Sequence, residues 1–357
     1  MSSLLLALML AAPSWAQTPL PRRDLGAIHD QFIESLEKEK KAEALEELAR
    51  TPPLTMQDTK WAFDLFMRFP EVPVRRAVIS ALNRIESGNV QLEAAFMEYL
   101  RLPEGESQVF GIIGALRLRS TRALPVITEI AQRRFRYKDP GDAVTASERN
   151  TWWAQYEALS ALAQWQGAKQ LPLLRNQAMA APTVAHIMAR YLWKDSLPTI
   201  ADWSRAGGSA AQAAQEAFNT EVPLADLRES YAAMLKLVRS RDADRELRHQ
   251  LAIKVGLASD DAGAEALLAE HSATRDPDTK LMLAAALFAS RNPKTVPWLE
   301  AQAQNNADPK TRMGALIQLR DMVPPEKHKS LLEWTAAKDP DEENRQAAAD
   351  LLKSKTP

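Results

Sequence analysis

The sequence predicts an all-α protein in which helical hairpins stack in series to form an α–α superhelix. Three observations predict this class: a repeat of 31 to 34 residues, prolines that mark helix starts, and the lack of any run with the two-residue alternation of a strand. Composition agrees, because 46% of the residues are hydrophobic while only 12 are Gly. That is few glycines for a nucleotide-binding α/β fold or a turn-rich β protein.

An Asp-Pro step gives the first mark of the repeat. It occurs at 276–277, 308–309 and 339–340, and each copy precedes an apolar helical stretch. Asp can accept from the free N–H groups of the first helical turn, and Pro fits the first helical position. We therefore expect a helix to start at each step, with Asp242 opening a fourth copy that lacks the proline.

A second mark alternates with the first and is expected to start the other helix of each hairpin. It is a Leu-Pro or Val-Pro step, present at Pro125, Pro172, Pro198, Pro223 and Pro297. Each unit then reads as helix A, turn, helix B in about 31 to 34 residues.

Further copies of helix A are expected upstream, at 72–82, 107–116 and 152–162. The helix over 281–288 is apolar on all sides, so we expect its neighbours to cover it from several directions.

Taken together, these marks resemble HEAT repeats, in particular the short form also found in bilin-lyase-like proteins (PBS-lyase-type). The resemblance is carried by the Asp-Pro turn, the Leu-Pro start of helix B, the Ala-Leu pairs at 81–82, 115–116 and 161–162, and a basic residue in the first turn (Arg75, Lys280, Arg312, Arg345). It implies about nine hairpins over 51–354, with an insertion at 137–150 and an irregular register over 181–240. Such solenoids serve many tasks, so the resemblance says little about function.

The N-terminus has the pattern of a secretory signal peptide over 1–16. An apolar run over 4–12 is followed by Pro13 and then Ser14-Trp15-Ala16, although no Lys or Arg precedes the run. We expect cleavage after Ala16 and a periplasmic or secreted protein. No other segment has the length of a membrane span, so no integral membrane segment is expected after cleavage.

Residues 17–50 are expected to form a linker and a charged capping helix. The helix is predicted over 30–50, with a thin apolar stripe of Ile33, Leu36, Leu45 and Leu48. A terminal repeat needs such a polar outer face.

Signatures of catalysis, metal binding and nucleic-acid binding are absent from the sequence. There is no Cys, the five His are scattered, and we find no GxxxxGK[ST], GxGxxG, GxSxG or HExxH motif. A net charge of −1 is not that of a dedicated nucleic-acid binder. We therefore expect no catalytic residues, no metal, no cofactor and no nucleic-acid partner.

A basic stretch and an aromatic concentration flank the insertion at 137–150, and this coincidence places the candidate binding site. The candidate residues are Arg133, Arg134, Arg136, Tyr137, Lys138, Trp152, Trp153 and Tyr156. Exposed Trp and Tyr are typical interface anchors, and a basic patch attracts acidic protein segments or anionic glycans. The alternatives are packing between repeats for the aromatic residues and a solvated, paired face for the basic ones.

Three functions remain open. The first is an exported, non-enzymatic scaffold that binds another protein of unknown identity. The second is a protein that binds envelope polysaccharide or peptidoglycan through the Trp/Arg-rich region 117–203. The third, more remote, is a bilin-lyase-like enzyme, which only the family resemblance suggests.

Overall fold

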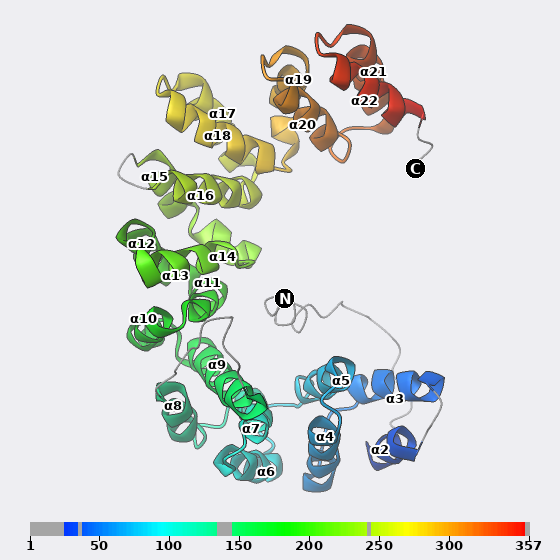
Figure 1. The fold of residues 1–357 in the computed structure, drawn as a ribbon, viewed down its shortest axis with the longest axis vertical. Helices are drawn as coiled ribbons and strands as arrows, with labels where there is room; N and C mark the ends of the chain where they lie inside the picture. Colours follow the sequence, from blue (N-terminus) through cyan, green and yellow to red (C-terminus); the bar gives the residue numbers. More distant parts are fainter. Residues whose placement is uncertain (1–24, 35–37, 134–144, 241–243, 354–357) are drawn as a thin grey trace. The chain divides into compact units, whose positions relative to one another are not determined.

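The structure is a computed structural model that describes residues 25–34, 38–133, 145–240 and 244–353. Within these ranges it is all-α and contains no strand, as the sequence predicts (Figure 1). Among the described residues, no helix is both long and apolar enough to cross a bilayer. The chain divides into two compact units, residues 1–181 and 182–357.

The first unit consists of helical hairpins arranged in two layers. Its elements are α2 (Leu25–Glu34), α3 (Lys38–Arg50), α4 (Met56–Arg68), α5 (Val72–Leu82), α6 (Val90–Arg101), α7 (Gly105–Leu118), α8 (Leu124–Gln132), α9 (Ala146–Gln166), η1 (Gly167–Gln170) and α10 (Leu171–Ala180). Helices α3, α5, α7 and α9 follow one another in one layer, and α2, α4, α6 and α8 in the other, with each pair such as α6 and α7 packed as a hairpin.

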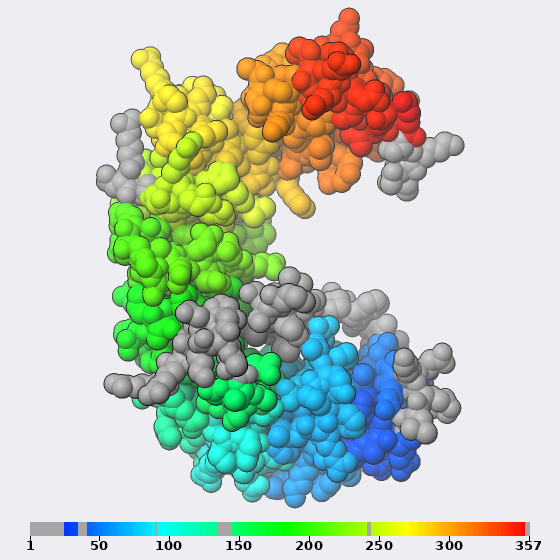
Figure 2. Space-filling model, in the orientation of Figure 1, coloured from blue at the N-terminus to red at the C-terminus, as the bar shows by residue number. Residues whose placement is uncertain are grey.

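The second unit contains hairpins of the same kind after a less regular start. Its elements are η2 (Pro182–Val184), α11 (Ala185–Tyr191), α12 (Trp193–Ala206), α13 (Gly208–Phe218), α14 (Leu224–Glu229), α15 (Tyr231–Arg239), α16 (Arg245–Ala258), α17 (Asp261–Ala273), α18 (Pro277–Ala289), η3 (Pro293–Thr295), α19 (Val296–Asn305), α20 (Pro309–Leu319), α21 (Pro325–Lys338) and α22 (Glu342–Lys353). The pairs α15/α16, α17/α18, α19/α20 and α21/α22 pack as hairpins. Within each unit, segments of adjacent colour touch, so chain neighbours are also spatial neighbours (Figure 2).

Several hydrogen bonds between successive hairpins join residues about one repeat apart. Arg75 on α5 bonds Glu106 on α7, 31 residues later. Ser259 and Ser290 share a bond across 31 residues, and Asn344 donates to the carbonyl of Pro309 across 35. The chain is therefore an all-helical protein whose helices pack in sequential order, consistent with a helical-repeat protein.

A side chain four residues after the N-cap position recurs as a tie to the preceding linker or helix. Arg75, Gln108, Arg248, Arg312 and Arg345 occupy this position on α5, α7, α16, α20 and α22, and each donates to a main-chain carbonyl 5 to 10 residues earlier. Lys280, which the sequence also marks as the basic residue of its repeat, is exposed instead.

Two of the three Asp-Pro steps start a helix as predicted. Asp276 and Asp308 are N-caps with Pro at the first helical position, and their carboxylates accept from backbone N–H groups of the first turn. The prediction was wrong at Asp339, which ends α21 and whose buried carboxylate accepts from Arg312 at 2.6 and 2.8 Å. Asp341 caps α22 in its place.

The helix of the fourth copy starts at Arg245, with Asp244 as its N-cap. The residue predicted to open this copy, Asp242, lies outside the described residues.

The proline marks hold at three of five positions. Pro125, Pro172 and Pro297 lie in the first turn of α8, α10 and α19, whereas Pro198 lies inside α12 and Pro223 is the N-cap residue of α14. At Pro198 the helix starts five residues earlier, at the fully buried Trp193. Both exceptions fall in the region of irregular register.

Two predicted boundaries also needed correction. The capping helix over 30–50 is two helices, α2 and α3, on either side of 35–37, which lie outside the described residues. The C-terminal part of the predicted insertion is helical, because α9 begins at Ala146. Thr145 and Glu148 form a capping box there, which is a sequence signal independent of the repeat pattern.

The apolar composition of α18 predicted that neighbours would cover it from several directions, but one of its sides is open to solvent. Met282, Leu283, Ala286 and Leu287 are buried, but Leu281 is 51% exposed. The α16 side is covered by close contact, since a Cβ on Gly256 of α16 would lie 2.1 Å from the carbonyl oxygen of Ala286.

Candidate functional site

The residues chosen from the sequence fall partly within the described structure. Arg134, Arg136, Tyr137 and Lys138 lie outside it. Arg133, Trp152, Trp153 and Tyr156 are described, and all four are partly buried. The wider aromatic concentration is divided between the two units, since Tyr191, Trp193 and Trp203 belong to the second.

Trp153 on α9 packs among side chains of earlier hairpins. Its ring lies 5.8 Å from that of Phe66 on α4, and the guanidinium of Arg75 lies over both rings at 5.4 and 5.1 Å. Arg75 is held there by the carbonyl of Phe66 and by the carboxylate of Glu106. This site joins three hairpins through one cation, and no spacing in the sequence connects Phe66 and Arg75 with Trp153.

The indole N–H of Trp153 donates to Glu157 Oε1 at 3.2 Å. Burial raises the pKa of the Glu157 carboxyl, and the bond from Trp153 opposes that shift. A raised pKa can mark a group that exchanges protons in a functional site. The described contacts of Glu157 and Trp153 pack α9 on earlier hairpins, and they assign no such role to the Glu157 carboxyl.

Arg133 is bound into the fold on both its main-chain and side-chain sides. Its Nη1 donates to Gln108 Oε1 at 2.9 Å, and its carbonyl accepts from Gln155 Nε2 at 2.6 Å. The guanidinium also lies 4.0 Å from Glu129. Arg133 thus ties the end of α8 to α7 and α9, while its side chain keeps 37% of its surface exposed.

Trp152 and Tyr156 form an aromatic pair on the surface of α9. Their ring centroids are 5.5 Å apart, and both side chains are partly exposed. Two neighbouring rings on a helix surface can stack on an apolar side chain or on the face of a sugar ring.

The basic residues that precede the site are mostly engaged with neighbours. Arg117 donates to Asn83 Oδ1 at 2.7 Å, and Arg122 lies 4.0 Å from Glu93. Arg119 ends α7 in the left-handed conformation, with φ at 53°. The described part of the basic stretch therefore consists largely of side chains that link hairpins.

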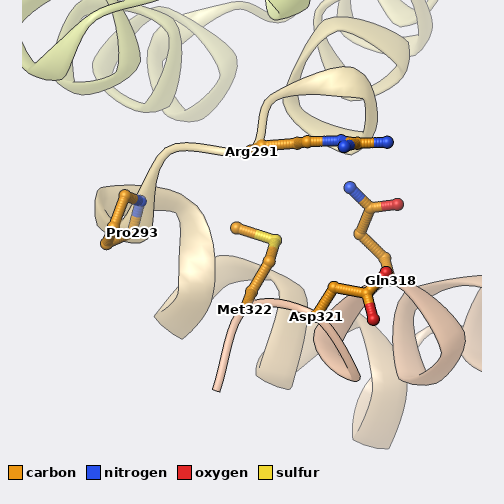
Figure 3. A pocket seen from close by; sticks show the side chains of 5 residues that line it. All are labelled: Arg291, Pro293, Gln318, Asp321 and Met322. Carbon is orange, nitrogen blue, oxygen red and sulfur yellow. The ribbon is translucent and has the colours of Figure 1, made fainter. Parts of the chain in front are cut away.

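The second unit contains a small surface pocket, with a volume of about 220 Å³. Arg291 and Pro293 line it from the segment after α18, and Gln318, Asp321 and Met322 from the end of α20 and the turn after it. The guanidinium of Arg291 faces the amide of Gln318 across the opening (Figure 3). The lining combines a guanidinium, an amide, a carboxylate and a thioether.

A buried cation lies elsewhere in the second unit, at Lys254 on α16. Its Nζ donates to the carbonyl of Thr220 at 3.1 Å and lies 5.3 Å from the ring of Trp193. Burial lowers the pKa of Lys254 to about 8. The Nε1 of Trp193 is buried without a hydrogen-bond partner. The ammonium therefore joins α16 to the preceding hairpin through a carbonyl and an aromatic face.

The histidines that the structure describes lie on different helices, and three of them make hydrogen bonds with separate partners. His29 bonds Asp30 and Asp64 at 3.0 Å, His186 bonds Glu216, and His328 bonds the carbonyl of Leu316. Within the described ranges no group of three or more His, Asp or Glu side chains could hold a metal ion. Comparison with protein-family models and with curated proteins finds no match to this chain.

Proposed function

We propose that this chain is a HEAT-type α-solenoid of about nine hairpins that acts as a non-enzymatic scaffold and binds another protein. The observation that carries the proposal is the repeating tie between hairpins, in which one side chain bonds a carbonyl of the helix or linker before it and an acid of the next hairpin. Hairpins joined in this way present similar helices in succession, which is the usual basis of partner binding by solenoids.

Export to the periplasm or secretion is part of the same proposal and rests on the signal pattern over 1–16. The candidate binding region is the one predicted from the sequence, around Arg133 and α9, where the side chains of Trp152 and Tyr156 remain partly accessible. The partner is unidentified.

Chemical crosslinking in the native envelope, followed by mass spectrometry, tests this proposal. We expect one partner protein to be recovered repeatedly, with crosslinks that map to the helices of the solenoid. Recovery of no partner from cells in which the protein is abundant would contradict the scaffold function. Processing is tested separately by the N-terminal sequence of the mature protein, expected to begin at Gln17.

A second candidate function is binding of envelope polysaccharide, supported by the partly exposed ring pair of Trp152 and Tyr156. Titration of intrinsic Trp fluorescence with cell-wall fragments distinguishes it from the first. A saturable shift that is lost in Trp152→Ala supports glycan binding, and the absence of a shift at high ligand concentration eliminates it.

A further inference from the structure

Three helices of the second unit each expose one large apolar side chain at related positions. Leu257, Leu281 and Ile317 are 48, 51 and 52% exposed, and they lie on α16, α18 and α20. They follow the N-caps of their helices, Asp244, Asp276 and Asp308, by 13, 5 and 9 residues. Because these positions differ by four residues, they fall on one face of the repeating helix. Of these helices, α16 and α18 pack closely on each other, whereas α18 and α20 make few direct contacts.

On α20 the surface around Gly314, three residues before Ile317, is open. A Cβ at Gly314 would have no atom within 4 Å, in contrast to Gly256, whose Cβ would collide with α18. Gly314 is also exposed. The pocket of Figure 3 begins at the next residue after Ile317, because Gln318 lines it together with Arg291 and Met322. Leu281, Gly314, Ile317 and this pocket define what we call the α18–α20 face.

Around the α18–α20 face the acidic side chains are all engaged, whereas several basic side chains have no acidic partner in the part of the chain that the structure describes. Between residues 276 and 322 every acid is used in a helix cap or an ion pair: Asp276, Asp278, Glu300, Asp308 and Asp321. Three cations of the same segment, Lys280, Lys310 and Arg291, are exposed and pair with no carboxylate among the described residues. An apolar surface bordered by unpaired cations is complementary to a partner that is apolar in the middle and acidic at its ends.

We infer that the α18–α20 face binds one amphipathic helix of a protein partner, with acidic residues at both ends of that helix. Lys280 lies in the first turn of α18, whereas Arg291 follows its last turn, 11 residues later. At 1.5 Å per residue this separation is roughly 16 Å, so the bound helix has about three to four turns. Its apolar residues follow the i, i+3, i+4, i+7 pattern of helices that dock in grooves. This inference rests on the proposed scaffold function and names a partner class and a place for it.

A second copy of the chain fits the face less well than a single helix. A stable dimer buries about 800 Å² on each partner. The exposed apolar surface here consists of a few half-exposed side chains, an area that a short helix can cover.

The test uses the full purified chain and three fluorescein-labelled helical peptides of 14 residues. All three have the same Leu pattern, and their terminal turns contain Glu, Gln or Lys. We expect saturable binding, measured by fluorescence anisotropy, in the order Glu over Gln over Lys, with at least a tenfold difference in Kd between the Glu and Lys peptides that shrinks at high salt. Equal affinity of the three peptides, or no saturable binding, would overturn the inference.

Two matched variants locate the binding. Ile317→Glu places a carboxylate in the α18–α20 face and is expected to weaken the Glu peptide at least tenfold. Leu224→Glu changes a side chain of similar exposure, 46%, on α14 and is expected to leave Kd unchanged. Circular dichroism confirms that both variants are folded. Equal effects of the two variants would contradict the placement, as would a dimer of the wild type that Ile317→Glu dissociates.

The inference and the proposed function can fail separately. Crosslinks that identify a partner on other helices, together with no binding of the Glu peptide, would overturn the inference and leave the scaffold function intact. Failure of crosslinking to recover any partner would contradict the scaffold function. If Ile317→Glu leaves the Kd of the Glu peptide unchanged, the inference is overturned whatever the crosslinking shows.

Discussion

Replacement of Gly256 by Ala is the sharpest test of how the hairpins of the second unit pack. The new Cβ would lie 2.1 Å from the carbonyl oxygen of Ala286 and 2.9 Å from the Cβ of Ala289. The first obstacle is backbone, which cannot rotate away, so α16 and α18 must separate by more than 1 Å to restore ordinary contact. Overpacking of this kind costs about 3 kcal/mol, and the better helix propensity of Ala returns about 1 kcal/mol. We expect a net destabilisation of about 2 kcal/mol.

Native-state hydrogen exchange followed by mass spectrometry measures this loss helix by helix, which suits a chain whose repeats contact mainly their neighbours. A loss of about 2 kcal/mol corresponds to roughly 30-fold faster exchange of the protected amides in α16 and α18. Gly314→Ala is the matched control. It adds the same methyl group to a helix interior where no atom lies within 4 Å, and we expect exchange in α20 to slow by a few-fold. Unchanged or slower exchange in α16 and α18 of the Gly256 variant would refute the close contact.

Three further predictions concern charged side chains. Asp339→Asn breaks a buried ion pair with Arg312 and is expected to lower the stability of α20–α22 by about 3 kcal/mol, measured by hydrogen exchange. Because Arg312 lowers the pKa of Asp339, the pair stabilises the fold above the unfolded pKa, and the wild type loses this advantage over the variant as the pH falls below about 4. Burial lowers the pKa of Lys254 in the folded protein to about 8, whereas the same side chain in the unfolded chain keeps its proton up to about pH 10.5, so the stability of the wild type rises with pH between these values. Lys254→Met is expected to remove this rise, which thermal melts across the pH range measure. An identical pH profile in wild type and variant would contradict the prediction. Arg119→Gly relieves a left-handed backbone at the end of α7 and is expected to stabilise that helix by about 1 kcal/mol, seen as slower exchange of its last turn.

The helices themselves were predictable because their signals are local. The helix expected over 72–82 is α5 with the same bounds, and Asp276 and Asp308 cap their helices because capping depends on one side chain and its own first turn. The capping box at Thr145 and Glu148 was equally local and could have placed the start of α9.

The errors arose where tertiary contacts override a local signal. Asp339 has the Asp-Pro pattern of a cap, but Arg312 from the preceding hairpin takes its carboxylate, and Asp341 caps the helix. Pro198 lies inside α12, and the first residue of that helix, Trp193, is buried against Phe218 and Lys254. A single sequence shows none of these long-range partners.

The candidate site was less predictable than the fold. The sequence marked Trp153 but gave no sign that Phe66 and Arg75 would meet it, since these residues precede it by 87 and 78 positions. The exposed position of Leu281 was also hidden, because an apolar residue within an apolar helix looks the same whether it is covered or not.

The arginines that bond both backwards and forwards have a mechanical consequence. Arg75, Arg248 and Arg312 each donate to a main-chain carbonyl earlier in their own hairpin and to an acid of the next hairpin. A change that displaces one of these arginines therefore removes bonds within a hairpin and between two hairpins at once. Fraying within a hairpin and separation from the next hairpin are thereby coupled, and we expect the smallest unit that opens cooperatively in this protein to be larger than one hairpin.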